Sequence, residues 1–246
     1  MKKAIVIIPA RFASTRFPGK PLVKIGSKTM IELVFEQASK CKSISDVYVA
    51  TDHEEIQKAV LAFGGKVVMT SENCQSGTDR CAEVVSIREI DEEIVVNIQG
   101  DEPFIKPEQI EQLVHLMQSE SVQIGTLAKK ITDSETIFNP NVVKLVLSKK
   151  GKALYFSRNP IPFMRGVENQ NWIEHGSFFK HIGIYAYQKS MLLEITKLPQ
   201  SKLELAESLE QLRWLEAGYD VYVAETNWES IGIDTPEDLE KVKDLF

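Results

Sequence analysis

Three positively charged residues are concentrated in one short loop near the start of the chain, within the sequence PARFASTRFPGKP of residues 9–21. Small and hydroxylated residues separate them, and the six together are Arg11, Ser14, Thr15, Arg16, Gly19 and Lys20. Guanidinium groups bind phosphate oxygens in pairs, lysine supplies a point charge, and glycine allows backbone N–H groups to approach. A solvated basic loop is the simpler alternative, but this composition favours binding of a triphosphate.

One aspartate is a candidate metal ligand, and a second has no structural explanation. Asp101 leaves an apolar segment beside a glycine, in NIQGDEP, where its carboxylate is well placed to hold Mg²⁺ against a phosphate. Asp234 lies in GIDTPED, where Thr235 and Pro236 are explained as the start of a helix. That capping leaves Asp234 unexplained.

A polar turn, SGTDR at residues 76–80, opens a predicted helix. This turn could simply cap the helix. Alternatively, its backbone groups could contact the edge of a base while Arg80 approaches phosphate. Known phosphate fingerprints are absent from the sequence, because there is no GxGxxG and the spacing of Gly19 and Gly26 does not fit a P-loop. The sequence therefore lacks the main evidence for a kinase or a dehydrogenase.

The elements that position these residues alternate through the first hundred residues. Continuous apolar runs predict strands, and apolar residues at helical spacing predict helices between them. The predicted strands are residues 4–8, 47–50, 66–69 and 94–98, and the helices are residues 30–38, 54–63 and 79–88. This alternation predicts an α/β fold with a doubly wound, mostly parallel sheet, and its ligand loops lie at the carboxyl ends of the strands.

The middle of the chain is different, because strands predominate at residues 142–147, 153–156 and 182–187. We interpret residues 125–190, approximately, as a β-rich lobe inserted into a single domain of residues 1–246. A helix at residues 203–217, a strand at 221–224 and a last helix at 236–245 return the chain to that domain.

Bulk composition excludes several classes of protein. The 246 residues carry a formal charge of −6, so no basic excess exists to bind nucleic acid. The three cysteines have no metal-ligand spacing, which indicates reduced thiols in a reducing compartment. The apolar run at residues 4–8 is too short for export or for crossing a bilayer. We expect a cytoplasmic protein without membrane insertion.

Seven motifs occur in order from the first predicted strand to the last helix: PARFASTRFPGKPL, SGTDR, NIQGDEP, ALYFSRNPIP, KHIGIYAY, ESLEQLR and GIDTPEDLE. In this order they closely resemble the 3-deoxy-manno-octulosonate cytidylyltransferases. The resemblance implies a nucleotide-diphospho-sugar transferase fold. It also implies transfer of CMP from CTP to the sugar acid 3-deoxy-D-manno-octulosonate (KDO), with release of pyrophosphate, for lipopolysaccharide or capsule synthesis.

The resemblance also implies roles for individual residues. The CTP phosphates would be held by Arg11, Arg16 and Lys20. The nucleoside end would be contacted by Ser76, Gly77 and Thr78, with Arg80 nearby. The ligands of Mg²⁺ would be Asp101 and Asp234, which with the three cations form the catalytic set. The sugar-acid pocket would be lined by Gln99, Arg158, His181, Tyr185, Glu210 and Gln211. The lobe would contribute to a homodimer.

The residues themselves are compatible with these roles but also with simpler ones. His181 and Tyr185 lie four apart on an alternating strand and should share one face. His181 could be a structural histidine, Tyr185 a core aromatic residue, and Glu210 a solvated helix residue. The family often has SGTER where this chain has SGTDR, and Asp79 should be tolerated if it faces solvent at the helix start.

Two alternative functions stay open at this point. The first is a cytidylyltransferase for another sugar acid, such as sialic acid or an 8-amino analogue of KDO. The sialic-acid enzymes tend to have a Gly-Ser-Lys-Gly type of opening, which this chain lacks. The second is a non-catalytic nucleotide or sugar sensor, against which the retention of both aspartates argues.

Overall fold

The computed structural model describes residues 2–13, 17–229 and 232–242. Arg16, with Ser14 and Thr15 of the predicted phosphate loop, lies outside the described residues. In the described ranges, no helix is both long and apolar enough to cross a membrane.

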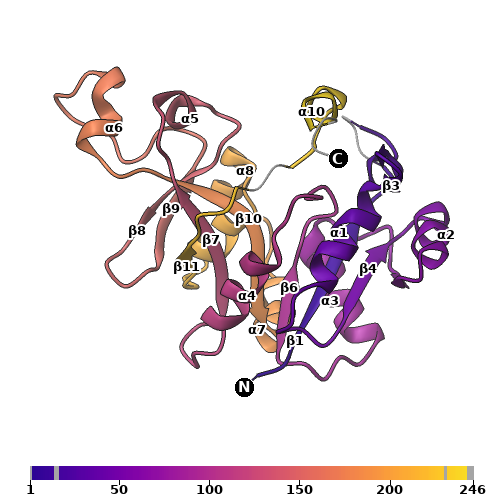
Figure 1. The fold of residues 1–246 in the computed structure, drawn as a ribbon. Helices are drawn as coiled ribbons and strands as arrows, with labels where there is room; N and C mark the ends of the chain where they lie inside the picture. The colour runs from indigo at the N-terminus through magenta and orange to yellow at the C-terminus, as the bar shows by residue number, and fades with distance from the viewer. Residues whose placement is uncertain (1, 14–16, 230–231, 243–246) are drawn as a thin grey trace.

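Among the described residues, nine strands form one sheet in the order β11-β7-β10-β6-β1-β4-β5, with β8 paired to β10 and β9 paired to β8 (Figure 1). The strands are β1 (Ala4–Ala10), β4 (Val47–Thr51), β5 (Lys66–Met69), β6 (Ile94–Asn97), β7 (Ile124–Lys130), β8 (Lys144–Leu147), β9 (Ala153–Ser157), β10 (Phe179–Gln188) and β11 (Tyr222–Glu225). A separate hairpin joins β2 (Lys24–Ile25) to β3 (Lys28–Thr29).

The N-terminal half of the sheet is parallel. β1 pairs in parallel with β4 and β6, and β4 pairs in parallel with β5. All seven residues of β1 are buried, as expected for a strand covered on both faces. β10 is antiparallel to both β6 and β7, and β11 is parallel to β7. The prediction of an α/β fold with a central, mostly parallel sheet is confirmed.

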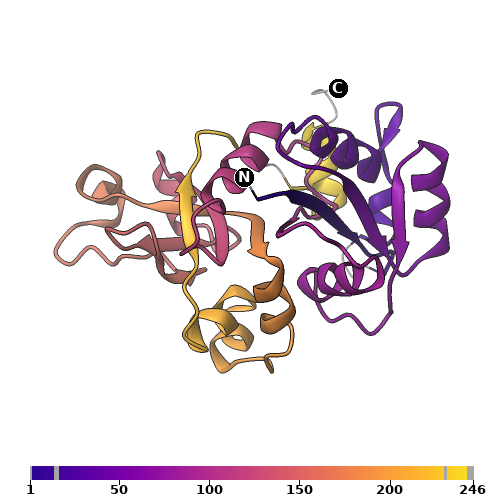
Figure 2. The same ribbon diagram turned by 90° about the horizontal axis from the view of Figure 1, so that it is seen from below.

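Helices cover both faces of this sheet (Figure 2). The helices are α1 (Met30–Ser39), α2 (Glu54–Ala62), α3 (Gly77–Ile87), α4 (Pro107–Leu116), α5 (Ser134–Phe138), α6 (Trp172–His175), α7 (Lys189–Ile195), α8 (Lys202–Glu207), α9 (Gln211–Glu216) and α10 (Pro236–Val242), with short 3-10 turns at η1 (Lys20–Leu22) and η2 (Asn169–Asn171). Val6 and Ile8 of β1 pack in one core with α1, α2 and α4. The alternate residues, Ile5 and Ile7, pack in a second core with α3, α7 and α9.

The middle of the chain begins and ends in the central sheet, because β7 and β10 pair with each other there. Between them, β8 and β9 form a hairpin, and the segments with α5, η2 and α6 extend beyond it, on the left of Figure 1. This extension has a small core of its own around Trp172 and Phe178.

The single helix predicted at residues 203–217 is wrong, because the structure has two helices there. The chain turns at Ser208, whose φ of 53° lies in the left-handed region, and α9 starts again at Gln211. The break places Glu210 between the two helices rather than on the solvated face of one.

Candidate active site

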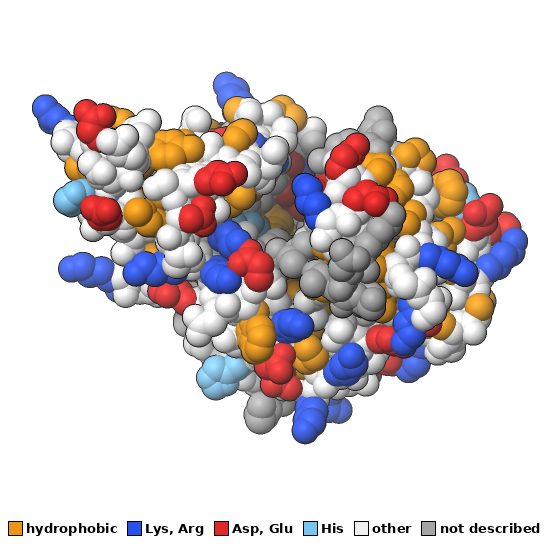
Figure 3. All heavy atoms as spheres, turned by 45° about the horizontal axis from the view of Figure 1, so that its top comes forward, with side chains coloured by type: hydrophobic (Ala, Val, Ile, Leu, Met, Phe, Trp, Pro, Cys, Tyr) orange, Lys and Arg blue, Asp and Glu red, His pale blue; other side chains and the backbone are white. Residues whose placement is uncertain are grey.

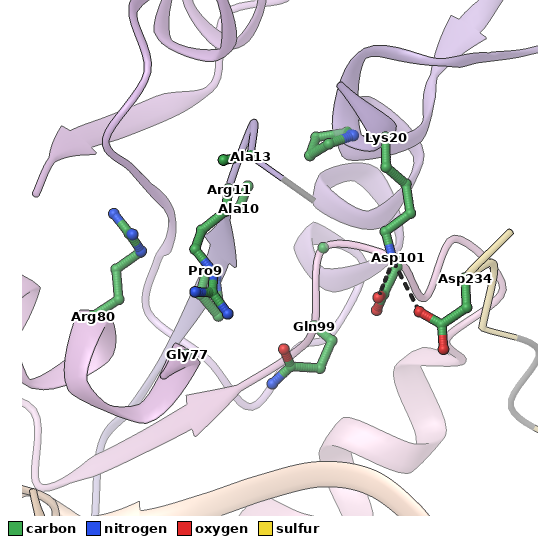
Figure 4. Close-up of a pocket in the computed structure, with 12 residues that line it drawn as sticks. Pro9, Ala10, Arg11, Ala13, Lys20, Gly77, Arg80, Gln99, Asp101 and Asp234 are labelled. Carbon is green, nitrogen blue, oxygen red and sulfur yellow. Dashed lines mark hydrogen bonds and ion pairs between the residues drawn. The ribbon is translucent and has the colours of Figure 1, made fainter. Parts of the chain in front are cut away.

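A pocket of about 320 Å³ opens at the carboxyl ends of β1 and β6. Its walls come from segments far apart in the sequence, namely Pro9, Ala10, Arg11, Ala13, Lys20, Pro21, Gly77, Arg80, Gln99, Gly100, Asp101 and Asp234 (Figure 4). The surface view in Figure 3 shows the molecule hollowed between the extension on the left and the N-terminal half on the right. The structure therefore brings together seven of the predicted site residues: Arg11, Lys20, Gly77, Arg80, Gln99, Asp101 and Asp234.

The ammonium group of Lys20 joins the two aspartates. Its Nζ lies 2.5 Å from Oδ2 of Asp101 and 3.1 Å from Oδ1 of Asp234. The Lys20 side chain is only 12% exposed. Burial alone would lower the pKa of Lys20, but the charges and hydrogen bonds of Asp101 and Asp234 outweigh it and raise the pKa above its ordinary value. A single cation thus already bridges two carboxylates that are 133 residues apart in the sequence.

Local backbone geometry brings these groups to one place. Gly19 has a φ of 69°, a conformation that favours glycine, and its N–H donates to the carbonyl of Phe12 across the loop. The Phe12 ring stacks on His53, with ring centroids 4.0 Å apart. A side chain at Gly100 would meet the carbonyl oxygen of Pro9 at 3.0 Å, so glycine lets the end of β6 approach β1. These contacts fix Lys20 and Asp101 opposite each other.

The two aspartates fit the requirements of Mg²⁺. Within the described ranges, no group of three or more His, Cys, Asp or Glu residues could enclose a metal ion. Mg²⁺, however, usually keeps several waters and binds through one or two carboxylates together with substrate phosphates. Asp101 and Asp234 converge on one cation, the ammonium group of Lys20, and Arg11 and Arg80 line the pocket beside them.

The start of α3 forms the opposite wall of the pocket. Ser76 caps the helix in a reciprocal arrangement with Asp79, whose carboxylate accepts from the backbone N–H of Ser76. This shows what Asp79 does, because the shorter acid completes the cap. Gly77 lines the pocket, whereas Thr78 turns away and donates to Oε2 of Glu210 at 2.8 Å.

Arg80 lies on the side of the pocket away from Lys20 (Figure 4) and is completely buried. Its guanidinium donates to Oδ2 of Asp52 at 2.6 Å and to Oγ1 of Thr70 at 2.5 Å. Among the described residues, its Nε has no hydrogen-bond partner. Arg80 therefore ties the ends of β4 and β5 to α3 and also borders the pocket.

The predicted sugar-binding residues extend from this pocket rather than line it, apart from Gln99. Nε2 of Gln99 donates to Oδ1 of Asn97 at 3.1 Å, and Asn97 lies opposite Tyr185 in the pairing of β6 with β10. The Tyr185 ring lies 5.2 Å from the ring of His181 and 5.1 Å from that of Trp214. A continuous wall therefore leads from Gln99 to His181.

A β-bulge, rather than simple alternation, brings His181 and Tyr185 together. Four residues of a regular strand span about 13 Å. The register with β7 shifts between Ile182 and Tyr185, which shortens that separation. The prediction that both rings share one face agrees with their contact, but the reason for it was incomplete.

Several polar atoms on this wall are buried without a partner in the described part of the chain: Tyr185 Oη, Tyr187 Oη and Gln211 Nε2. Burial raises the pKa of the Glu210 carboxyl above its ordinary value, against hydrogen bonds from the Ser76 and Thr78 hydroxyls that lower it. Buried polar atoms without partners are uncommon in proteins, and a ligand with hydroxyl groups could satisfy them.

Arg158 is held at the junction of α8 and α9. Its Nε donates to the carbonyl of Glu207 at 2.8 Å, and its backbone N–H donates to the Glu207 carboxylate at 2.9 Å. Arg158 thus adjoins the segment that carries Glu210, and it is outside the pocket beside Lys20.

Three residues of this region are not among the site residues predicted from the sequence: Asn97, Thr126 and Tyr187. Tyr187 lies two residues after Tyr185, and its ring stacks against Tyr185 with centroids 6.0 Å apart. Side chains alternate between the two faces of a strand, so this spacing already places Tyr187 on the same face as Tyr185. No sequence signal distinguished Asn97 or Thr126, because their contacts depend on strand pairing.

A buried ion pair holds α8 against α9 and thereby fixes Glu210 between them. Nε and Nη2 of Arg213 lie 2.7 Å and 2.6 Å from the two carboxylate oxygens of Glu204. Burial would raise the pKa of Glu204, but hydrogen bonds from Arg213 and from the Ser201 N–H hold it below its ordinary value of 4.5.

We expect Glu204→Gln to lower the free energy of unfolding by about 3 kcal/mol near pH 7, because Arg213 loses its buried partner. A carboxyl group whose pKa is lower in the folded state than in the unfolded state stabilises the protein at pH values above its unfolded-state pKa. This contribution is lost as the pH falls through its folded-state pKa. The difference in unfolding free energy between wild type and variant, measured by urea denaturation, should therefore shrink as the pH falls below 4.5. Glu36→Gln, which breaks the more exposed pair with Lys28, is the control. If Glu204→Gln lost as much unfolding free energy at acidic pH as at pH 7, this role of the Glu204 carboxylate would be contradicted.

Known proteins resemble this chain over nearly its whole length. The sequence profile of a family described as cytidylyltransferase matches residues 5–231. A relative from Cytophaga hutchinsonii, named 3-deoxy-manno-octulosonate cytidylyltransferase, is 52% identical over 239 residues, which cover 97% of this chain and 95% of the relative. One of the same name from Parabacteroides distasonis is 53% identical over 245 residues, with 98% and 97% covered.

Two solved structures resemble this chain to different degrees. A structure described as CMP:2-keto-3-deoxy-manno-octonic acid synthetase complexed with CTP is 42% identical, with a TM-score of 0.90, and the match covers 99% of this chain and 98% of the other. A 4-diphosphocytidyl-2C-methyl-D-erythritol synthase from Anaerococcus prevotii is 13% identical, with a TM-score of 0.61 and the same coverage. This second protein shares the fold alone.

Proposed function

The chain belongs to the cytidylyltransferases, and within them to the 3-deoxy-manno-octulosonate cytidylyltransferases, and we propose that it transfers CMP from CTP to the anomeric hydroxyl of KDO. The products are CMP-KDO and pyrophosphate. One observation supports this activity most strongly, namely the pocket in which Arg11 and Lys20 face Asp101 and Asp234. That arrangement combines cations for a triphosphate with carboxylates for a metal ion.

The proposed reaction is a direct in-line displacement. The anomeric hydroxyl oxygen of KDO attacks the α-phosphorus of CTP, a new P–O bond forms, and the bond to pyrophosphate breaks. Arg11 and Lys20 bind the phosphates and neutralise the negative charge that develops on the leaving pyrophosphate. Arg16 belongs to the same loop, and we propose that it shares this role.

We propose that Asp101 and Asp234 hold Mg²⁺. The ion would supply Lewis acidity, which would lower the pKa of the attacking hydroxyl group and stabilise negative charge on the phosphates. Asp101 enters from the end of β6 and Asp234 from the segment before α10, so the site is complete only when these two distant segments are folded together. Lys20 bridges both carboxylates and borders the same pocket.

We propose that the nucleoside end of CTP lies along the start of α3, against Ser76 and Gly77, with Arg80 behind them. Thr78, which donates to Glu210, would hold this end of the helix in place. Support comes from Gly77 and Arg80, which border the pocket. The sugar acid would occupy the adjoining wall, whose residues are Gln99, Arg158, His181, Tyr185, Glu210 and Gln211. The unpartnered buried atoms of Tyr185 and Gln211 support a ligand rich in hydroxyl groups there.

We also propose a homodimer that forms through the lobe of residues 125–190, where two apolar side chains are exposed: Leu154 at 60% and Phe163 at 75%. We propose a cytoplasmic enzyme whose product serves lipopolysaccharide or capsule synthesis. The three free thiols, Cys41, Cys74 and Cys81, are consistent with a reducing compartment.

A pyrophosphate-release assay with CTP and Mg²⁺ tests the function. We expect rapid release with KDO, much slower release with sialic acid, and none without a sugar acid. The 8-amino analogue of KDO, run beside them, measures how strongly the site reads one hydroxyl group. Release that is faster with sialic acid than with KDO would contradict the substrate, and no release with any acid would contradict catalysis.

A further inference from the structure

Thr126 of β7 is completely buried at the β-bulge of β10. Its Oγ1 has three close neighbours on that strand: the carbonyl oxygen of Ile184 at 2.8 Å, the carbonyl oxygen of Ile182 at 3.3 Å, and Nε2 of His181 at 2.9 Å. The bulge turns these carbonyls out of the regular ladder, and buried carbonyls require a donor. The hydroxyl of Thr126 supplies one.

The chemistry of these atoms determines which of them donates to which. A threonine hydroxyl has one hydrogen, and a carbonyl oxygen can only accept. An Oγ1–oxygen distance of 2.8 Å therefore commits that hydrogen to Ile184. Nε2 of His181 lies at hydrogen-bond distance from the same Oγ1, so it must carry the hydrogen of that second bond. His181 is then protonated on Nε2, and Nδ1 carries a lone pair.

The surroundings of His181 keep the ring neutral. Burial lowers the pKa of His181 to about 3, and the ring packs between Phe156 and Tyr185, each with its centroid 5.2 Å away. As a whole residue, His181 is nevertheless only partly buried. Across the described residues, no hydrogen bond to Nδ1 is found. Nδ1 is therefore the polar atom of this ring that is left for a ligand.

We propose that Thr126 is a positioning residue that fixes His181 as the Nε2–H tautomer, so that Nδ1 accepts a hydrogen bond from a hydroxyl group of the sugar acid rather than pairing with its carboxylate. The identity of the ligand rests on the proposed function, whereas the tautomer does not. A neutral acceptor selects for a hydroxyl at this point, because a carboxylate oxygen there would face a lone pair.

Nitrogen-15 NMR of the histidine rings in the free protein tests the tautomer. The chain has four histidines, and His181→Gln identifies the signal that belongs to His181. We expect the protonated nitrogen of His181 to be the one coupled strongly to both carbon-bound ring protons, which identifies Nε2. Thr126→Val should broaden or shift this signal, and Thr126→Ser, which keeps the hydroxyl, should preserve it. Protonation on Nδ1 in the wild type, or an unchanged signal in Thr126→Val, would overturn the proposal.

Kinetics then test the ligand. Thr126→Val should raise the KM for KDO by about tenfold and leave the KM for CTP within about twofold, since one hydrogen bond to the sugar is misdirected. Thr126→Ser should restore the wild-type KM. Equal increases for both substrates would reveal general damage and overturn the positioning role. If the wild type proves inactive with KDO, the proposed function fails, but the NMR result still decides the tautomer.

Discussion

Asp101→Asn is expected to lower kcat for CMP-KDO synthesis by about three orders of magnitude while the protein stays folded. Metal catalysis contributes several kcal/mol to such reactions, and each 1.4 kcal/mol changes a rate tenfold. Asparagine keeps the shape of Asp101 but removes the charge with which it faces Asp234 and Lys20. Pyrophosphate release at saturating CTP and KDO measures the loss, and circular dichroism measures the fold.

Asp220→Asn is the matched control, because Asp220 also pairs with a lysine, Lys152, but on an exposed surface. Its kcat should stay close to that of the wild type, since exposed pairs contribute little. Excess Mg²⁺ should rescue the Asp101 variant only in part, because Asp234 remains as one ligand. Near-normal turnover of the Asp101 variant would remove this residue from the metal site.

Lys20→Ala is expected to raise the KM for CTP by about ten- to a hundredfold, with a much smaller effect on the KM for KDO. A charge-assisted hydrogen bond to a phosphate is worth about 1.5–3 kcal/mol. The substitution also leaves Asp101 and Asp234 facing each other without the cation that now joins them. The melting temperature without metal should therefore fall, and added Mg²⁺ should recover it more than in the wild type.

Lys28→Ala controls for the loss of a lysine, because Lys28 pairs with Glu36 outside the pocket. Its CTP kinetics and its response to Mg²⁺ should match those of the wild type. Unchanged CTP kinetics in the Lys20 variant would exclude Lys20 from the triphosphate site, whatever happens to stability.

The parts of this protein that follow local rules were predictable from its sequence. The buried run of β1 and the alternation of strands and helices placed the loop of Arg11 and Lys20 at the edge of the sheet. The buried run of β6 likewise places Asp101 at that edge of the sheet. These features depend on neighbours in the sequence, so their pattern is visible without a structure.

The sugar-side wall was not predictable in this way. His181 contacts Tyr185 because β10 is bulged against β7, and the bulge is a property of two strands rather than one. Glu210 lies between two helices because the backbone turns at Ser208, a residue whose type gives no sign of a left-handed conformation. For these positions the family resemblance carried the information that local patterns lack.

Arg80 shows another limit of prediction from the sequence. A cation at the start of a helix is compatible with phosphate binding, and the structure does place it at the pocket. Its guanidinium, however, already donates to Asp52 and Thr70, which come from two other strand ends. Only tertiary structure shows that a charge beside a pocket is already paired with another group.

The most direct test of the proposed site is a crystal structure of the protein with Mg²⁺ and a non-hydrolysable analogue of CTP. The proposal predicts the metal ion between the carboxylates of Asp101 and Asp234, with Lys20 and Arg11 on the phosphates and the base along the start of α3. A triphosphate bound elsewhere, or a metal ion that touches neither aspartate, would contradict it.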